Sequence, residues 1–347
     1  MNINNPYLPI NPNWLKLNTE EPIEPNLKII DPHHHLWDLE FGTYLYKDFL
    51  ADIKSSGHNV LASVYIMSSA NTKIYDKSSA KEYESIPEII FACRQAKKAK
   101  INNKNVCKIN ESIVGSLDLR YGKKLIPVIE KAIYISKGKL KGIRMLLAAH
   151  SDPNISSGAV KTPLGIMKDP KFLDGAKILK NYDLSLDFWI HHTQLNEMEN
   201  VARSIPELSI ILNHIGGPIH LGPYERKTAL THREWRHSMM RLATLPNISV
   251  KLGGLGMAVN GSKFYKNSAP PSSDDLCESW KPWIFETIDL FGFERCMFES
   301  NFPVDKGSCS YGNLWNGFKK ISKSMSRDEK DKLFYKNAAK TYKISLE

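Results

Sequence analysis

The chain has 347 residues, 42% of them hydrophobic, which is enough for a full core and fits one large α/β barrel as well as two ordinary domains. No apolar run approaches the roughly 20 residues that a membrane-spanning helix needs, and the N-terminus lacks the basic-then-apolar order of a secretory signal, so we expect a cytoplasmic protein without membrane association. The 47 basic and 37 acidic residues give a net charge of +10, but the lysines are scattered rather than interleaved with aromatic residues in one stripe. This distribution argues against a nucleic-acid partner and leaves an anionic small-molecule substrate open.

Residues 1–26 are rich in Asn and Pro, and we expect them to form an N-terminal extension that packs on a single domain of residues 27–347. In that domain short β-branched runs alternate with segments whose apolar residues have helical spacing, which is typical of βα units. The expected strands are 27–30, 60–67, 112–117, 140–145, 184–190, 208–213, 248–252 and 295–299. Eight such units, with no Gly-x-Gly-x-x-Gly fingerprint, favour a closed (β/α)₈ TIM barrel over an open doubly wound sheet.

The segments between the expected strands fit this architecture. Residues 86–93, 125–132 and 276–288 each place apolar side chains on one helical face, which would cover a parallel sheet. Three long connections, 68–82, 148–168 and 258–274, follow the second, fourth and seventh strands. Because barrel active sites are built at that end, we expect these connections to shape a substrate pocket. The five cysteines are scattered and never form a Cys-x-x-Cys pair, so we expect reduced thiols.

Polar side chains are concentrated where the expected strands end, at the face of a barrel that carries the active site. They are Asp31, His33, His35, Arg144, His191, His192, Asn213, His214, Lys251, Ser300 and Asn301.

The first of these groups has the spacing of a metal site. His33 and His35 are two residues apart in an extended segment, so both imidazoles can face one centre while His34 points elsewhere. Zinc or a similar divalent ion accepts such nitrogens and would keep a position open for water. The alternative is a pair of imidazoles that only hydrogen-bond to the substrate or only pack in the core.

Two further histidines follow the fifth and sixth strands. His192 could complete a metal site or bind a substrate carbonyl, whereas its neighbour His191 must point away from it. His214 precedes Gly216 and Gly217, a turn that lets backbone approach a ligand closely. We therefore predict catalytic roles for His192 and His214.

Two basic residues are candidates for substrate binding. Arg144 supplies a planar fork suited to a carboxylate, with a structural salt bridge as the alternative. Lys251 could neutralise substrate charge or pair with a carboxylate of the barrel.

Read in order, these residues resemble the amidohydrolase superfamily, in the amidohydrolase-related group of sugar-acid lactonases and pyrone-dicarboxylate lactonase. The resemblance covers nearly the whole chain. Its strongest parts are residues 30–38 (IDPHHHLWD), 212–218 (LNHIGGP), 250–257 (VKLGGLGM) and 295–305 (RCMFESNFPVD).

The resemblance implies a distorted (β/α)₈ barrel in which His33 and His35 form a metal-binding pair. His192 and His214 match the family's histidines after strands five and six. It also implies hydrolysis of a lactone or related carboxylic ester, with metal required in some members and not in others.

Two positions depart from the family pattern. Asn301 stands where the family has an aspartate that takes a proton from the attacking water, and an amide cannot serve as that base. Met67 aligns with a glutamate of the lactonases. Glu299, Asp305 or Asp118 could replace the lost charge. Asn301 could instead orient water or a substrate carbonyl, with His214 or His192 as the base.

The sequence thus favours a hydrolase that opens a lactone or ester of a small carboxylated substrate, with one divalent metal such as Zn²⁺ as the candidate cofactor. A metal-dependent non-oxidative decarboxylase and a catalytically idle ligand-binding barrel are the alternatives. The large apolar residues Trp280, Trp283 and Trp315 could lie in the core or at a subunit interface. The sequence is therefore compatible with a homo-oligomer.

Overall fold

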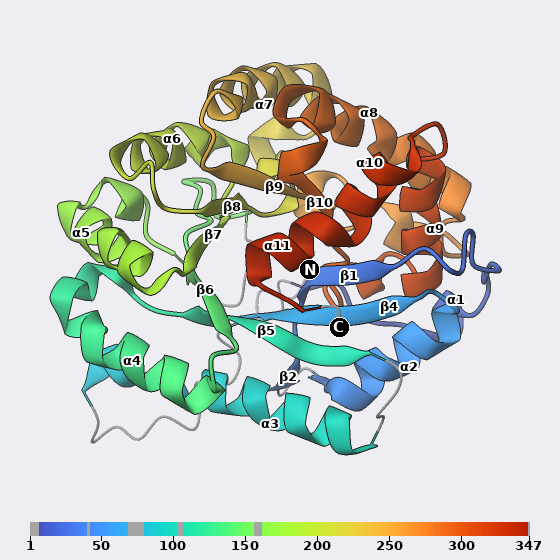
Figure 1. Ribbon diagram of the computed structural model, residues 1–347. Coiled ribbons are helices and arrows are strands. Elements are labelled where there is room, and N and C mark those ends of the chain that lie inside the picture. Colours follow the sequence, from blue (N-terminus) through green and yellow to red (C-terminus); the bar gives the residue numbers. More distant parts are fainter. Residues whose placement is uncertain (1–6, 40–41, 69–79, 103–106, 156–161, 346–347) are drawn as a thin grey trace.

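A barrel of parallel strands organises the chain (Figure 1). The computed structural model describes residues 7–39, 42–68, 80–102, 107–155 and 162–345. Within them, eight strands form one sheet in the order β1-β4-β5-β6-β7-β8-β9-β10, and all neighbours pair in parallel. They span Ile29–His34 (β1), Val60–Ile66 (β4), Lys108–Ser116 (β5), Leu140–Leu146 (β6), Ser185–Trp189 (β7), Ile210–Leu212 (β8), Ile248–Leu252 (β9) and Cys296–Phe298 (β10).

The first and last strands meet and nearly close the sheet. His34 forms an isolated parallel bridge with Phe302, and the backbone N–H of His35 donates to the carbonyl of Phe302 at 2.7 Å. The predicted (β/α)₈ barrel is therefore confirmed, and all eight predicted strands are present.

Helices alternate with the strands and surround them (Figure 1). They span Pro12–Leu15 (α1), Tyr46–Ser56 (α2), Ile86–Asn102 (α3), Leu125–Ser136 (α4), Pro170–Leu179 (α5), Leu195–Ser204 (α6), Thr228–Ala243 (α7), Ser273–Phe291 (α8), Tyr311–Ile321 (α9), Arg327–Asp331 (α10) and Asn337–Tyr342 (α11). The apolar faces predicted in α4 and α8 are buried; in α3, Ile90 and Cys93 are only partly covered. The barrel thus has a continuous apolar layer between sheet and helices.

The first strand is longer than predicted, and a hairpin that was not predicted follows it. Pro32 has no N–H to donate, and the pairing with β4 shifts between Asp31 and His34, yet β1 continues to His34. The antiparallel strands Trp37–Leu39 (β2) and Gly42–Tyr44 (β3) lie beyond it. They extend the chain outward from the carboxyl end of β1.

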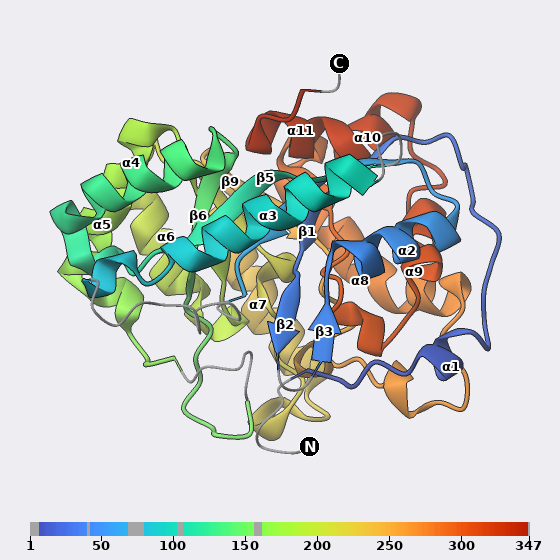
Figure 2. The same ribbon diagram turned by 90° about the horizontal axis from the view of Figure 1, so that it is seen from below.

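The two ends of the barrel are covered by different parts of the chain. Ala338 and Tyr342 of α11 pack against Ile30 and Val64 inside the barrel. In Figure 2, α11 and the β2–β3 hairpin lie on opposite sides of the molecule. The hairpin therefore marks the end at which the candidate site lies.

Several remaining predictions can be compared with the described residues. The extension contacts α9, because Asn316 accepts from the backbone N–H of Ile23 at 2.8 Å. The five cysteines are free thiols. Most of the predicted pocket connection 68–82, residues 69–79, and a smaller part of connection 148–168, residues 156–161, lie outside the described residues. None of the described helices has the length and apolar character needed to cross a membrane.

Candidate active site

The imidazole rings of His33 and His35 come together where β1 ends. Their Nε2 atoms lie 3.2 Å apart. Nδ1 of His35 lies 2.8 Å from the carbonyl oxygen of Ile66 and carries the proton, because a carbonyl only accepts. His34 points away from the pair and stacks on Phe49 with 4.1 Å between ring centroids. The structure thus gives the two histidines the common direction that their spacing predicted.

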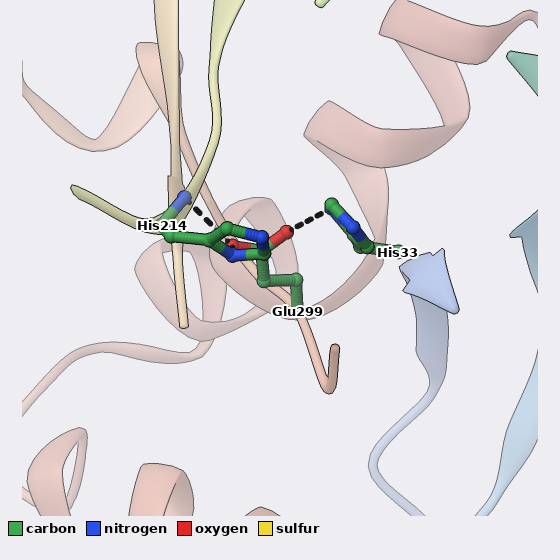
Figure 3. Close-up of side chains that lie close together, drawn as sticks. All are labelled: His33, His214 and Glu299. Atoms are coloured by element: carbon green, nitrogen blue, oxygen red, sulfur yellow. Dashed lines mark hydrogen bonds and ion pairs between the residues drawn. The ribbon is translucent and has the colours of Figure 1, made fainter. Parts of the chain in front are cut away.

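Glu299, which follows β10, lies between two histidines (Figure 3). Its Oε2 is 2.7 Å from Nδ1 of His33, and its Oε1 is 2.6 Å from Nδ1 of His214. It also accepts the backbone N–H of His214 at 3.0 Å. A carboxylate only accepts, so Nδ1 of His214, which is hydrogen-bonded to Glu299, carries its proton and the Nε2 of that ring keeps a lone pair. The contact with His33 has ion-pair distance but not hydrogen-bond geometry. Glu299 therefore fixes the tautomer of His214 and lies against the ring of His33.

This arrangement depends on two glycines after β9. A Cβ at Gly253 would lie 2.5 Å from Cγ of Glu299, and one at Gly254 would lie 2.4 Å from Nδ1 of His214. His214 and Asn301 have left-handed backbones, with φ of 54° and 55°. Such residues cost roughly 1–3 kcal/mol each and cluster at functional sites. The glycines and the left-handed residues thus allow the polar side chains of Glu299 and His214 to lie close to the backbone after β9.

Arg144 on β6 brings a positive charge to the histidine pair. One amino group lies 3.4 Å from Nε2 of His33, and the other donates to the carbonyl of Met67. The side chain is buried, which lowers its pKa. In the described part of the chain, its Nε has no hydrogen-bond partner and no carboxylate lies at ion-pair distance. A buried guanidinium without an ion-pair partner is suited to binding an anion.

Asn301 is held by a second buried acid. Its Nδ2 donates to Oδ1 of Asp305 at 2.8 Å, and the backbone N–H of Gly256 donates to Oδ2 at 2.9 Å. Burial raises the pKa of Asp305 to about 7. The backbone N–H of Asn301 donates to the carbonyl of His33 at 2.9 Å. Asp305 therefore orients the Asn301 amide, leaving its carbonyl oxygen as the remaining side-chain acceptor.

His192 has other neighbours. Its Nδ1 accepts from the backbone N–H of Ile219 at 3.2 Å, and its Nε2 lies 3.5 Å from a carboxylate oxygen of Glu234. Its ring packs edge-on against Tyr224. None of these contacts, all within the described residues, joins it to the group of His33, His35 and His214.

Lys251 is paired with a carboxylate of the barrel, one of the two roles considered for it. Its Nζ lies 2.9 Å from Oδ2 of Asp187 and 2.9 Å from the carbonyl oxygen of Pro32. Both side chains are fully buried. The hydroxyl of Tyr342 donates to the same Asp187 oxygen at 2.8 Å.

Of the acids named as replacements for the missing family carboxylates, Glu299 contacts the histidines directly and Asp305 lies behind Asn301. Asp118 does not take part, because it caps a turn and pairs with Arg120 at 2.6 Å. In the sequence, the position of Glu299 at the end of the last strand was the feature that could indicate a role in the site. The sequence could not show that its two oxygens reach two different histidines.

Comparison with known proteins identifies the family. Residues 114–344 match the family model described as amidohydrolase. The chain belongs to the amidohydrolase family. A relative from Sinorhizobium fredii, an uncharacterized protein, is 31% identical over 92% of this chain and 99% of its own length. The predicted membership of the amidohydrolase superfamily is thus confirmed. The prediction that the protein is a hydrolase of that superfamily is confirmed with it.

More distant relatives have named activities. An L-fucono-1,5-lactonase from Burkholderia multivorans is 23% identical over 91% of this chain and 96% of its own length. An L-rhamnono-gamma-lactonase from Scheffersomyces stipitis is 24% identical over 91% of this chain and 99% of its own. A solved amidohydrolase from Burkholderia multivorans with bound zinc has the same fold, with a TM-score of 0.65 and 20% identity over 91% of this chain and 99% of that one.

Proposed function

We propose that this amidohydrolase opens the lactone ring of a small carboxylated substrate by adding water. The observation that carries the proposal is the buried guanidinium of Arg144, 3.4 Å from Nε2 of His33. It would hold a substrate carboxylate beside the histidines, where the reacting carbonyl would then lie. The relatives named as sugar-acid lactonases support this reaction class.

We infer further that His33 and His35 hold a divalent cation. Nδ1 of His35 donates to the carbonyl of Ile66, and Nδ1 of His33 lies 2.7 Å from Oε2 of Glu299. With the proton of each ring on Nδ1, the two Nε2 lone pairs would face each other at 3.2 Å. Two imidazole nitrogens this close together would serve as ligands of one divalent cation such as Zn²⁺. His33, His214 and Glu299 also form a buried group with ligand atoms within 4.8 Å of one another. Because Glu299 already contacts both Nδ1 atoms, we assign it the orienting role that carboxylates have behind metal-bound histidines.

The remaining residues account for the attack of water. A bound cation polarises a carbonyl and lowers the pKa of water. His214 accepts the proton of the attacking water at Nε2, while Glu299 stabilises the resulting imidazolium through Nδ1, 2.6 Å away. The carbonyl oxygen of Asn301 accepts a hydrogen bond from the same water and orients it. This division of roles replaces the aspartate that the family carries at Asn301.

The proposal is tested by offering the protein a panel of sugar-acid lactones and pyrone carboxylates. Hydrolysis is measured through the proton that it releases. Elemental analysis of the purified protein measures bound metal in parallel. We expect one divalent ion per chain and hydrolysis of at least one carboxylated lactone. Release of carbon dioxide from an aromatic or muconate-like acid, without lactone hydrolysis, would support a decarboxylase instead.

A further inference from the structure

The guanidinium of Arg144 is anchored to one peptide group at the end of β4. One of its amino groups donates to the carbonyl of Met67, which belongs to the peptide that joins Met67 to Ser68. The N–H of Met67 remains in the sheet and donates to the carbonyl of Val114 at 2.9 Å. The direction in which Arg144 points therefore depends on how this peptide is held.

The N–H of the same peptide is bonded to a buried acid of helix α3. Oε1 of Glu88 accepts the backbone N–H of Ser68 at 2.8 Å and the hydroxyl of Tyr65 at 2.9 Å. Glu88 is 1% exposed and lies in the first turn of α3, where the helix dipole stabilises a carboxylate. Glu88 and Arg144 thus contact the two ends of one peptide dipole, the acid at its N–H and the guanidinium at its carbonyl.

The order of these charges is favourable. An acid at the N–H and a cation at the carbonyl polarise the peptide in the same sense, so each hydrogen bond strengthens the other. The charge of Glu88 is also among those that counteract the lowering of the Arg144 pKa by burial. A carboxylate in direct contact with the guanidinium would occupy the donors that an anionic ligand needs. Because Glu88 acts across a peptide, it supports Arg144 without occupying those donors.

We propose that Glu88 is a positioning residue: through the Met67–Ser68 peptide it holds the guanidinium of Arg144 in the direction that binds the substrate carboxylate. This inference rests on the anion-binding role proposed for Arg144. It gives helix α3, which lies outside the barrel, a part in the recognition of substrate. Glu88 acts through its hydrogen bond to the peptide, because a negative charge alone would weaken the binding of an anion.

Binding of benzoate and of uncharged benzamide, measured by calorimetry on the full chain, tests the inference without requiring turnover. The two ligands have nearly the same shape, so the ratio of their affinities reports on the guanidinium, and Arg144→Met measures its share. Glu88→Leu removes the acceptor of the Ser68 N–H, whereas Glu88→Gln keeps an oxygen there and removes the charge. Gln95→Leu is the matched control, because Gln95 is a buried residue of the same helix whose Oε1 accepts the backbone N–H of Tyr46 at 3.3 Å.

We expect the unaltered protein to prefer benzoate, and Arg144→Met to abolish that preference. Glu88→Leu should weaken benzoate binding about tenfold, because a displaced guanidinium no longer meets the carboxylate, and should leave benzamide binding unchanged. Glu88→Gln should retain the benzoate affinity of the unaltered protein. Gln95→Leu should lower Tm and change neither affinity.

The inference is overturned if Glu88→Leu binds benzoate as tightly as the unaltered protein, or if it loses benzamide to the same extent. It is also overturned if Glu88→Gln loses as much benzoate affinity as Glu88→Leu. If Glu88→Leu does not fold, the double variant Tyr65→Phe/Glu88→Leu replaces it, since this variant also removes the hydroxyl that donates to Glu88, and Tyr65→Phe alone is then the reference.

The same measurements separate this inference from the proposed function. If the preference for benzoate requires Arg144 but is indifferent to Glu88, the anion site stands and the inference fails. If the unaltered protein does not prefer benzoate, both fail. If benzoate behaves as expected but no lactone is hydrolysed, the positioning role of Glu88 stands and the proposed reaction fails.

Discussion

Two groups of buried polar side chains occupy the same barrel and differ in how their charges are matched. In the interior, Lys251 and Asp187 form an ion pair at 2.9 Å, and Tyr342 and Pro32 provide further hydrogen bonds. At the carboxyl end of the strands, Arg144 has no carboxylate at ion-pair distance among the described residues, and the Nε2 atoms of His33 and His35 lie 3.2 Å apart. The first group is complete within the chain. The second is not, which is why we propose that it binds an anion and a cation.

The largest effect should come from His33→Ala. Removing one of the two nitrogens that we propose bind metal should abolish stoichiometric metal and reduce kcat/KM by roughly 10³-fold or more. His34→Gln is the matched control on the same strand. His34 bonds to Ser63 at 2.9 Å, so its loss should lower Tm and leave the metal content unchanged. Unchanged turnover in His33→Ala would refute the assigned role.

Substitution in the buried pair Lys251–Asp187 should change the stability of the protein rather than its affinity for substrate. Lys251→Met leaves Asp187 buried without its cation, which typically costs about 3–5 kcal/mol of unfolding free energy. The double variant Lys251→Met/Asp187→Leu should recover much of that loss. Urea unfolding measures both. If Lys251→Met folds with normal stability but shows a raised KM, then Lys251 binds substrate, the other role that its sequence position allows.

Glu299→Gln should weaken metal binding at the proposed site without removing an imidazole nitrogen. An amide presents one acceptor where the carboxylate presented two, so one of the two histidine contacts, 2.6 and 2.7 Å long, is lost. Loss of such an orienting carboxylate typically reduces metal affinity 10–100-fold. Competition with a chelator gives that affinity. Full metal affinity together with reduced turnover would restrict the role of Glu299 to His214.

The smallest effect, counted per pH unit, concerns Asp305. Burial raises its pKa from 3.8 to about 7. Between these values the unfolded chain has released a proton that the folded protein retains, so this group makes stability fall as pH rises from about 4 to about 7. The slope is at most about 1.4 kcal/mol per pH unit. Asp305→Asn should remove this contribution, which urea unfolding at several pH values would show as a stability difference that changes with pH. A constant difference would contradict the prediction.

The sequence by itself determined the barrel and the end at which its site lies. The alternation of β-branched runs with helical faces depends on local spacing, so all eight strands could be found from it. The pairing of His33 with His35 is equally local, since the two side chains are separated by one residue on a strand.

Only the tertiary structure decided how the polar residues divide between core and site. Lys251 and Arg144 both lie on strands and both are basic, yet Asp187 is within 3 Å of one and no carboxylate in the described segments pairs with the other. Glu299 reaches His33 and His214 across the barrel, and Tyr7 reaches Trp37 from outside it. These contacts join residues that are far apart in the chain. They depend on barrel closure and backbone approach, which no local pattern encodes.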